Sequence, residues 1–121
     1  MIGTETFAYK YSDSGEILEK KSFNYNGELN ERRVYSYEKG KLINELRYNN
    51  ESILIYKQIE KYDSKGHNIE SNFYQYVEGE LIRRMKAVSI NDEKGNWIEM
   101  KQYMNDELKA IKKRQINYFN W

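Results

Sequence analysis

The chain has 121 residues and a formal net charge of +1, with 32% charged and 39% hydrophobic residues. This length predicts one domain over residues 1–121. Twelve tyrosines raise the aromatic content to 15%, which excludes a disordered chain, and the lack of cysteine excludes disulfides and thiolate metal sites. The balanced charge creates no overall field that would attract nucleic acid or an anionic membrane, so neither is an expected partner.

The sequence carries no sign of membrane insertion. No apolar run approaches the roughly 18 residues of a membrane-spanning helix, and the first ten residues, MIGTETFAYK, lack the pattern of a signal peptide. A cytoplasmic protein and a secreted or surface fragment expressed without its signal peptide both fit these observations.

Eight turns at regular intervals divide the chain. Four segments place Asp, Ser or Glu early and Gly late: 11–17, 37–43, 62–69 and 91–98. Four others are shorter or lack that pattern: 25–29, 48–53, 76–81 and 103–108. The segments between them are rich in Tyr, Ile, Val, Phe and Leu and predict nine strands. We expect an all-β antiparallel meander of about nine strands, either a twisted single-layer sheet or an open up-and-down barrel.

The strands predicted over 16–25 and 28–37 have apolar residues at their ends and charged residues in their centres. Asn26-Gly27 between them predicts a two-residue type I′ turn, in which both residues have positive φ. Because neighbouring strands run antiparallel, we expect cross-strand ion pairs among the charged strand centres. The residues concerned are Glu19, Lys21, Glu31 and Arg33.

Two segments in the middle of the chain are more apolar. Residues 52–59 (SILIYKQI) and 81–90 (LIRRMKAVSI) carry aliphatic side chains on both faces of a strand. Both predict strands covered on two sides, and hence a sheet that curls over them.

The strand over 67–77 supplies the candidate partner-binding residues. Ile69, Phe73 and Val77 share one face, and Tyr74 and Tyr76 share the other with polar neighbours. If the first face is the core, the two tyrosines are displayed on a rigid sheet and can contact a protein or a glycan. The alternative is that these tyrosines simply cover the sheet.

The last segment allows two interpretations. Residues 105–119 could form a helix capped at Asn105 or Asp106, but the repeat predicts a strand there. The basic cluster 108–115 would be split between the two faces of such a strand, with Lys109 and Lys113 opposite Lys112 and Arg114. Charges of this kind protect an edge strand from aggregation more often than they bind nucleic acid.

His67, with Asp63 and Ser64 nearby, has the residue types of a catalytic triad. Sister turns have Glu16, Lys41 and Asn96 at the position of the histidine, so an ordinary turn accounts for the cluster. One histidine and no cysteine also argue against zinc, and the acidic turns are too short for a calcium loop. We therefore expect no catalytic residues, no metal and no cofactor.

The units YDSKGHNIE and NDEKGNWIEM resemble the YD repeats of bacterial Rhs-type and teneurin-like surface proteins. The residues that carry the resemblance are Tyr62, Asp63, Gly66 and Ile69 in the first unit, and Asp92, Gly95 and Trp97 in the second. The shorter YNGEL turn looks like a MORN-related repeat, a class that includes some antitoxins. These resemblances imply an all-β scaffold without catalysis in its repeats.

Together these observations favour a bacterial, non-enzymatic binding or scaffold module built of β-hairpin repeats, with a protein or glycan partner. One alternative is a small soluble inhibitor or immunity protein that blocks a toxin or nuclease through a sheet face. Another is an enzyme that holds a small ligand inside a closed barrel. The sequence leaves the oligomeric state open.

Overall fold

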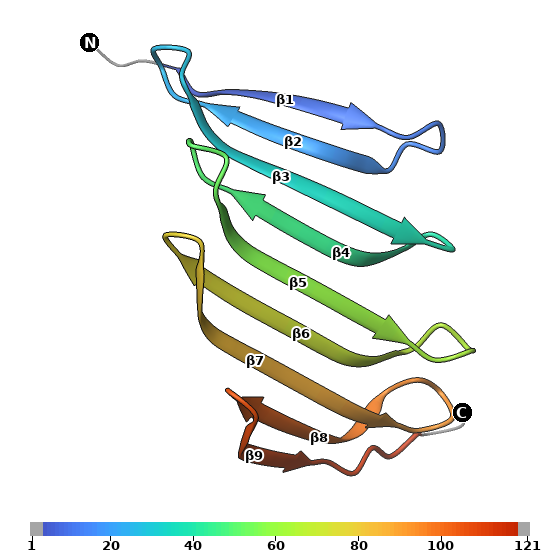
Figure 1. Cartoon of the computed structure of the whole chain (residues 1–121). Coiled ribbons are helices and arrows are strands. Elements are labelled where there is room, and N and C mark those ends of the chain that lie inside the picture. The colour runs from blue at the N-terminus through green and yellow to red at the C-terminus, as the bar shows by residue number, and fades with distance from the viewer. Residues whose placement is uncertain (1–3, 119–121) are drawn as a thin grey trace.

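A computed structural model describes residues 4–118 as one antiparallel sheet in which each strand pairs with its neighbours in sequence (Figure 1). The strands are β1 (Thr6–Tyr11), β2 (Ile17–Phe23), β3 (Leu29–Glu38), β4 (Lys41–Tyr48), β5 (Leu54–Tyr62), β6 (Asn68–Val77), β7 (Glu80–Asn91), β8 (Trp97–Met104) and β9 (Glu107–Lys113). The predicted all-β meander of nine strands is confirmed, and the segment after residue 105 is a strand rather than a helix. β1 and β9 lie at opposite edges of the sheet, which therefore stays open and does not close into a barrel.

The eight hairpin turns fall into two types. Five have a hydrogen-bonded loop in which a Ser, Asn or Asp precedes the left-handed residue by three positions: 12–16, 24–28, 49–53, 63–67 and 92–96. Three are two-residue turns with positive φ at both positions: 39–40, 78–79 and 105–106. The predicted type I′ turn at Asn26-Gly27 is wrong, because only Gly27 has positive φ. The Asn24 Oδ1 accepts the N–H groups of Asn26 and Glu28 instead, which produces the longer loop.

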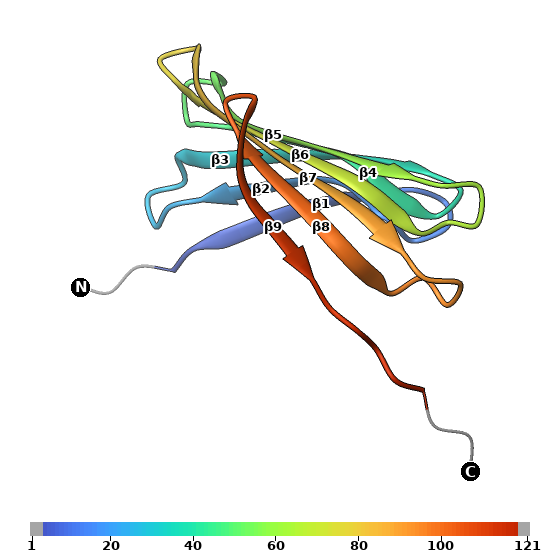
Figure 2. The same cartoon turned by 90° about the horizontal axis from the view of Figure 1, so that it is seen from below.

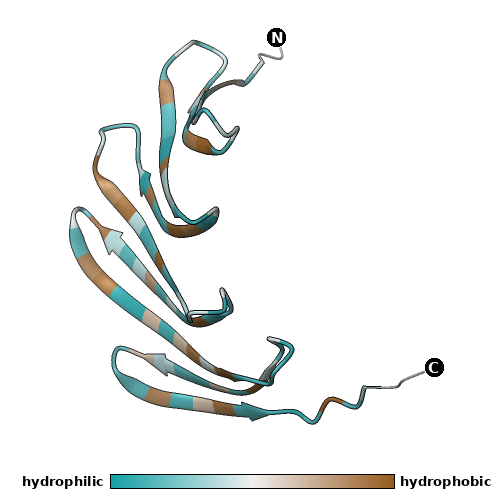
Figure 3. Ribbon diagram, turned by 90° about the vertical axis from the view of Figure 1, so that its right-hand side faces the viewer, coloured by the Kyte–Doolittle hydropathy of each residue, from teal (hydrophilic) through white to brown (hydrophobic). Residues whose placement is uncertain are grey.

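Each ladder contains one β-bulge close to its turn. In each case the second strand of the hairpin carries the extra residue. These residues are Leu18, Asn30, Ile43, Ile55, Ile69, Ile82, Ile98 and Lys109. Bulges bend a strand and increase its twist, and the sheet is strongly curved when seen from its side (Figure 3). In six of the eight ladders the extra residue is therefore an aliphatic one, Leu or Ile.

The sheet is a single layer (Figure 2). Among residues 4–118 no hydrophobic side chain is buried, and the two buried residues are Glu45 and Asn72. The prediction that the strands over 52–59 and 81–90 are covered on both sides is therefore wrong. Ile82 and Ile90, both on β7, are 56% and 53% exposed. Hydrophobic and hydrophilic residues follow one another along the strands (Figure 3).

Cation–tyrosine pairs join neighbouring strands where a globular domain would have an aliphatic core. The cation and the tyrosine stand directly opposite each other in Arg32–Tyr48, Arg47–Tyr56 and Lys57–Tyr74. In these pairs the charged group lies 4.5, 4.3 and 4.8 Å from the ring centroid. Each such contact stabilises by roughly 0.5–1 kcal/mol where it is solvent-accessible. The tyrosine-rich composition thus serves cross-strand packing.

The expected cross-strand ion pairs do not form. Glu19 stands opposite Val34, and Glu31 stands opposite Ser22, so the charged centres of β2 and β3 lie on different faces of the sheet. Cross-strand ion pairs form instead at Glu70 of β6, which contacts Lys61 of β5 and Lys86 of β7. Four other ion pairs join residues two positions apart within one strand. They are Glu19–Lys21, Glu31–Arg33, Glu45–Arg47 and Glu107–Lys109.

The two faces of the sheet follow from the register, because residues directly opposite each other share a face. One consecutive row reads Lys10, Glu19, Val34, Leu46, Lys57, Tyr74 and Arg84. We call its face the Tyr74 face. The next row reads Tyr9, Lys20, Arg33, Arg47, Tyr56, Gln75 and Arg83, and its face is the Tyr56 face.

Candidate binding surface on the open sheet

Tyr74 lies at the centre of the sheet, on β6. It stands between Lys57 of β5 and Arg84 of β7, its direct partners in the two ladders. The ammonium group of Lys57 lies 4.8 Å from the centroid of the Tyr74 ring. A shallow hollow of about 270 Å³ borders the ring. The predicted contact residue thus has a cation opposite it on each flanking strand, and Lys57 covers its ring.

Glu70 organises the charges beside Tyr74. Its carboxylate accepts a hydrogen bond of 2.8 Å from the Asn72 amide and pairs with Lys61 at 3.0 Å and Lys86 at 3.6 Å. The Asn72 bond, followed by the two lysines, holds the pKa of Glu70 below its usual range. Glu70 is therefore a stable anion that fixes two lysines on this face.

Tyr76 belongs to a different environment from Tyr74. It follows the bulge between β6 and β7 and stands opposite Leu81. Val77, Leu81 and Ile82 around it are about half exposed. The face that was expected to form a core is open, because Phe73 is only half-buried and Val77 is 52% exposed. The two tyrosines therefore belong to one half-buried strand whose two sides both meet solvent.

The Tyr74 face carries most of the positive charge of the sheet. Within the paired residues of β1–β9 its cations are Lys10, Lys21, Arg32, Lys41, Lys57, Lys61, Arg84, Lys86, Lys101 and Lys113. Its carboxylates are Glu19, Glu38, Glu70 and Glu99. On the Tyr56 face the corresponding cations are Lys20, Arg33, Arg47, Arg83 and Lys112, and the carboxylates are Glu31, Glu45, Glu60, Glu80 and Glu107. Sequence reasoning missed this asymmetry because the total charge is close to zero and the register was unknown.

Many of the remaining carboxylates lie in the turns. Asp13 and Glu16 are in the first turn, Asp63 is in the fifth, and Asp92 and Glu93 are in the seventh. The ends of the strands are thus acidic while the Tyr74 face is basic.

His67 and Asp63 form a turn. Asp63 Oδ1 accepts the N–H groups of Lys65 and His67 at 3.0 and 2.9 Å, and the His67 Nδ1 lies 3.7 Å from Asp63 Oδ2. The bond from His67 N–H, with that from Lys65, lowers the pKa of Asp63. Within residues 4–118 no hydrogen bond joins Ser64 to the imidazole. In the first turn the position of Asp63 is taken by Ser12, whose Oγ accepts the Glu16 N–H, and not by Asp13.

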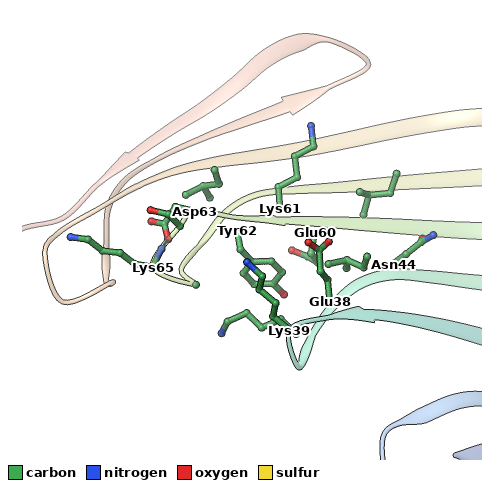
Figure 4. Close-up of a pocket in the computed structure, with 14 residues that line it drawn as sticks. Glu38, Lys39, Asn44, Glu60, Lys61, Tyr62, Asp63 and Lys65 are labelled. Atoms are coloured by element: carbon green, nitrogen blue, oxygen red, sulfur yellow. Dashed lines mark hydrogen bonds between the residues drawn. The ribbon is translucent and has the colours of Figure 1, made fainter. Parts of the chain in front are cut away.

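A hollow of about 860 Å³ lies where β4 begins and β5 ends (Figure 4). Lys61 points to one side of the strands, whereas Glu60 and Tyr62 point to the other (Figure 4). Tyr62 is held by a hydrogen bond from its hydroxyl to the Leu42 carbonyl oxygen and by the Lys41 ammonium over its ring. Residues on both sides of one layer line this hollow, so it does not enclose a single ligand. The barrel interior that an enzyme reading required is not formed, because the sheet is open.

The basic cluster 108–115 is divided as expected for an edge strand. Lys112 stands opposite Met100 on the Tyr56 face, and Lys113 stands opposite Glu99 on the Tyr74 face. Arg114 stacks on Trp97 at 3.9 Å and donates to its carbonyl oxygen.

Within the described part of the chain, no three histidine or acidic side chains converge in the way a metal site requires. The same residues contain no helix that could cross a membrane. A comparison with protein-family models finds no match, and a comparison with curated proteins finds none either.

Proposed function

We propose that the chain is a non-catalytic binding module that contacts a protein or a glycan through the Tyr74 face. The observation that carries this proposal is the row of Lys57, Tyr74 and Arg84 across three central strands. A tyrosine ring flanked by cations on rigid strands offers apolar area and hydrogen-bonding groups at low entropic cost.

The openness of the sheet supports a binding role over a catalytic one. Catalytic sites exclude water from the reacting groups and strengthen their electrostatics in this way. The hollows beside Tyr74 and at the ends of β4 and β5 are open to solvent and lie on a single layer. A surface of this kind suits a partner that covers it.

The test is a pulldown from the native host, followed by mass spectrometry, with three forms of the immobilised chain. Tyr74→Ala removes the proposed contact, and Tyr56→Ala is its matched control, because Arg47 covers Tyr56 on the opposite face as Lys57 covers Tyr74. We expect Tyr74→Ala to lose a partner that the wild type and Tyr56→Ala retain. Equal recovery by all three folded forms would refute the proposal.

The same experiment addresses the inhibitor alternative. If the partner lost by Tyr74→Ala is a toxin or nuclease, its activity with and without the bound chain shows whether the chain inhibits it. Binding to an arrayed glycan that Tyr74→Ala loses and Tyr56→Ala keeps would identify a carbohydrate partner instead.

A further inference from the structure

We infer that the Tyr74 face docks an acidic protein surface. This inference rests on the proposed function and names the chemistry of the partner. Ten cations against four carboxylates give this face a strong positive charge in a chain whose net charge is only +1. Interfaces bring potentials of opposite sign together, which increases the association rate and excludes wrong partners.

The strongest part of this charge lies around Tyr74. Lys57 and Arg84 stand directly opposite Tyr74 in the two ladders. On the same face Lys86 stands one row further along, and Lys61 stands two rows further along. Glu70 lies between these two lysines and contacts both, and Asp106 pairs with Arg84. These two carboxylates leave the cluster with a net positive charge, and they fix the cations in a pattern that a partner's carboxylates can match.

The arrangement favours a protein over a single-stranded nucleic acid. Single-strand binders offer aromatic faces on which bases stack. Two of the rings on this face are already covered, Tyr48 by the Arg32 guanidinium and Tyr74 by the Lys57 ammonium. The acidic turns at the ends of the strands, such as those of Asp63 and Asp92, would also repel a phosphate chain that ran past the sheet. A compact acidic surface meets neither obstacle.

The positive charge of the Tyr74 face also bears on the inhibitor alternative. Nucleases bind phosphate groups, and surfaces that bind a phosphate backbone are rich in lysine and arginine. A basic sheet face would be repelled by such a surface. If the chain is an inhibitor that acts through the Tyr74 face, its target therefore presents carboxylates there.

Two double variants with the same net charge test the inference. Lys57→Glu with Lys101→Glu reverses two charges on the Tyr74 face, and Lys20→Glu with Lys112→Glu reverses two on the opposite face. The probes are a poly-L-glutamate peptide, an oligothymidylate of equal charge and a poly-L-lysine control. Binding is followed by amide chemical shifts of the full chain at low and high salt, with the fold of each variant checked by its own spectrum.

We expect poly-L-glutamate to shift amides of β5–β8 and to bind more tightly than the oligothymidylate at equal salt. The Tyr74-face variant should weaken this binding about tenfold, with little change in the opposite-face variant, since close charge pairs at interfaces contribute on that scale. Tighter binding of the oligothymidylate would replace the acidic-protein assignment with a nucleic acid. Equal loss in both variants, or no binding of poly-L-glutamate at low salt, would overturn the inference.

These outcomes are independent of the pulldown. A partner that depends on Tyr74 but presents a neutral or basic surface would leave the binding role intact and contradict the acidic assignment. If no partner in the pulldown depends on Tyr74 but the chain still prefers poly-L-glutamate, the acidic assignment stands and the proposed binding role of Tyr74 is contradicted.

Discussion

The imidazole of His67 lies against Gly95 of the next turn at the same end of the sheet: a Cβ built on this glycine would stand 2.5 Å from Nε2. Lys41 relates to Gly66 in the same way, with its Cε 2.9 Å from the position of a Cβ. Asn96, at the equivalent position of the following turn, donates to the Tyr118 hydroxyl. The residue after the turn glycine is therefore the one that reaches to the next segment.

Because of this contact, substitution of Gly95 by alanine should destabilise the fold more than the same substitution at a glycine that only adopts positive φ. Gly15 and Gly95 have φ values of 88° and 86°, but nothing lies within 4 Å of a Cβ on Gly15. We expect Gly15→Ala to cost about 1 kcal/mol of unfolding free energy, the penalty of the left-handed conformation. Gly95→Ala should cost roughly 0.5–1 kcal/mol more, because the imidazole must move.

Urea unfolding measures both values. Adding His67→Ala to Gly95→Ala should return the loss to that of Gly15→Ala. If His67→Ala brings no recovery, the contact between the imidazole and the glycine has no energetic weight.

Ser52 takes the position that glycine occupies in four other turns, with φ at 63°. Ser52→Gly removes the left-handed penalty of a residue with a Cβ and adds some unfolded-state entropy. We expect a net gain of about 0.5 kcal/mol in unfolding free energy. Ser36→Gly, in the middle of β3, is the control and should destabilise. Destabilisation by Ser52→Gly as well would show that the serine makes a compensating contact.

Glu45 and Arg47 should contribute more stability than Glu31 and Arg33, although both pairs are Glu-x-Arg on adjacent strands. The Glu45 side chain is 10% exposed and that of Glu31 is 28% exposed. Arg47→Ala leaves a nearly buried carboxylate without its partner and should cost about 2 kcal/mol. Arg33→Ala should cost less than about 1 kcal/mol, as for accessible ion pairs.

A double-mutant cycle with Glu45→Gln separates the ion pair from the stacking of Arg47 on Tyr56. The coupling energy should exceed that of the matched Glu31→Gln and Arg33→Ala cycle. Equal coupling energies in the two cycles would mean that the burial of Glu45 does not make its ion pair with Arg47 more stabilising.

Stability should fall as pH drops below about 4, the ordinary range of an aspartate pKa. The turn N–H of His67, with that of Lys65, lowers the pKa of Asp63, and the Tyr118 hydroxyl, with two turn N–H groups, lowers that of Asp92. A carboxyl whose pKa is lower in the folded state stabilises the fold above its unfolded pKa. That contribution disappears as pH falls through the folded pKa.

Asp63→Asn tests this directly. Asn24 and Asn49 hold the same position in other turns, and each accepts the N–H groups of the residues two and four positions further along, as Asp63 does. The variant should therefore keep the turn at neutral pH and lose less stability than the wild type on acidification, as measured by urea unfolding at several pH values. Asp13→Asn is the control, because Asp13 lies in the first turn one position after Ser12, the residue that corresponds to Asp63. This variant should keep the wild-type dependence of unfolding free energy on pH.

The sequence was sufficient for the strand number and the order of the sheet, because glycines with positive φ mark six of the eight turns. It was not sufficient for the turn type at Asn26-Gly27, where the side chain of Asn24 decides the loop length. Nor did it reveal that Ile43 and Ile69 are bulge residues, since a bulge depends on pairing with the neighbouring strand. The location of Tyr74 between two cations required the register of three strands.

Contacts in this sheet are restricted to strands that follow one another in the chain. Stability in such an architecture is close to a sum of nearest-neighbour terms. A disturbance at β1 reaches β6 only by opening each ladder between them, so fraying of one edge leaves the surface around Tyr74 insulated. Because consecutive strands alternate in direction, insertion or deletion of one complete hairpin preserves which end of the sheet each later turn occupies. The chain can therefore gain or lose length in two-strand steps without rebuilding the rest of the molecule.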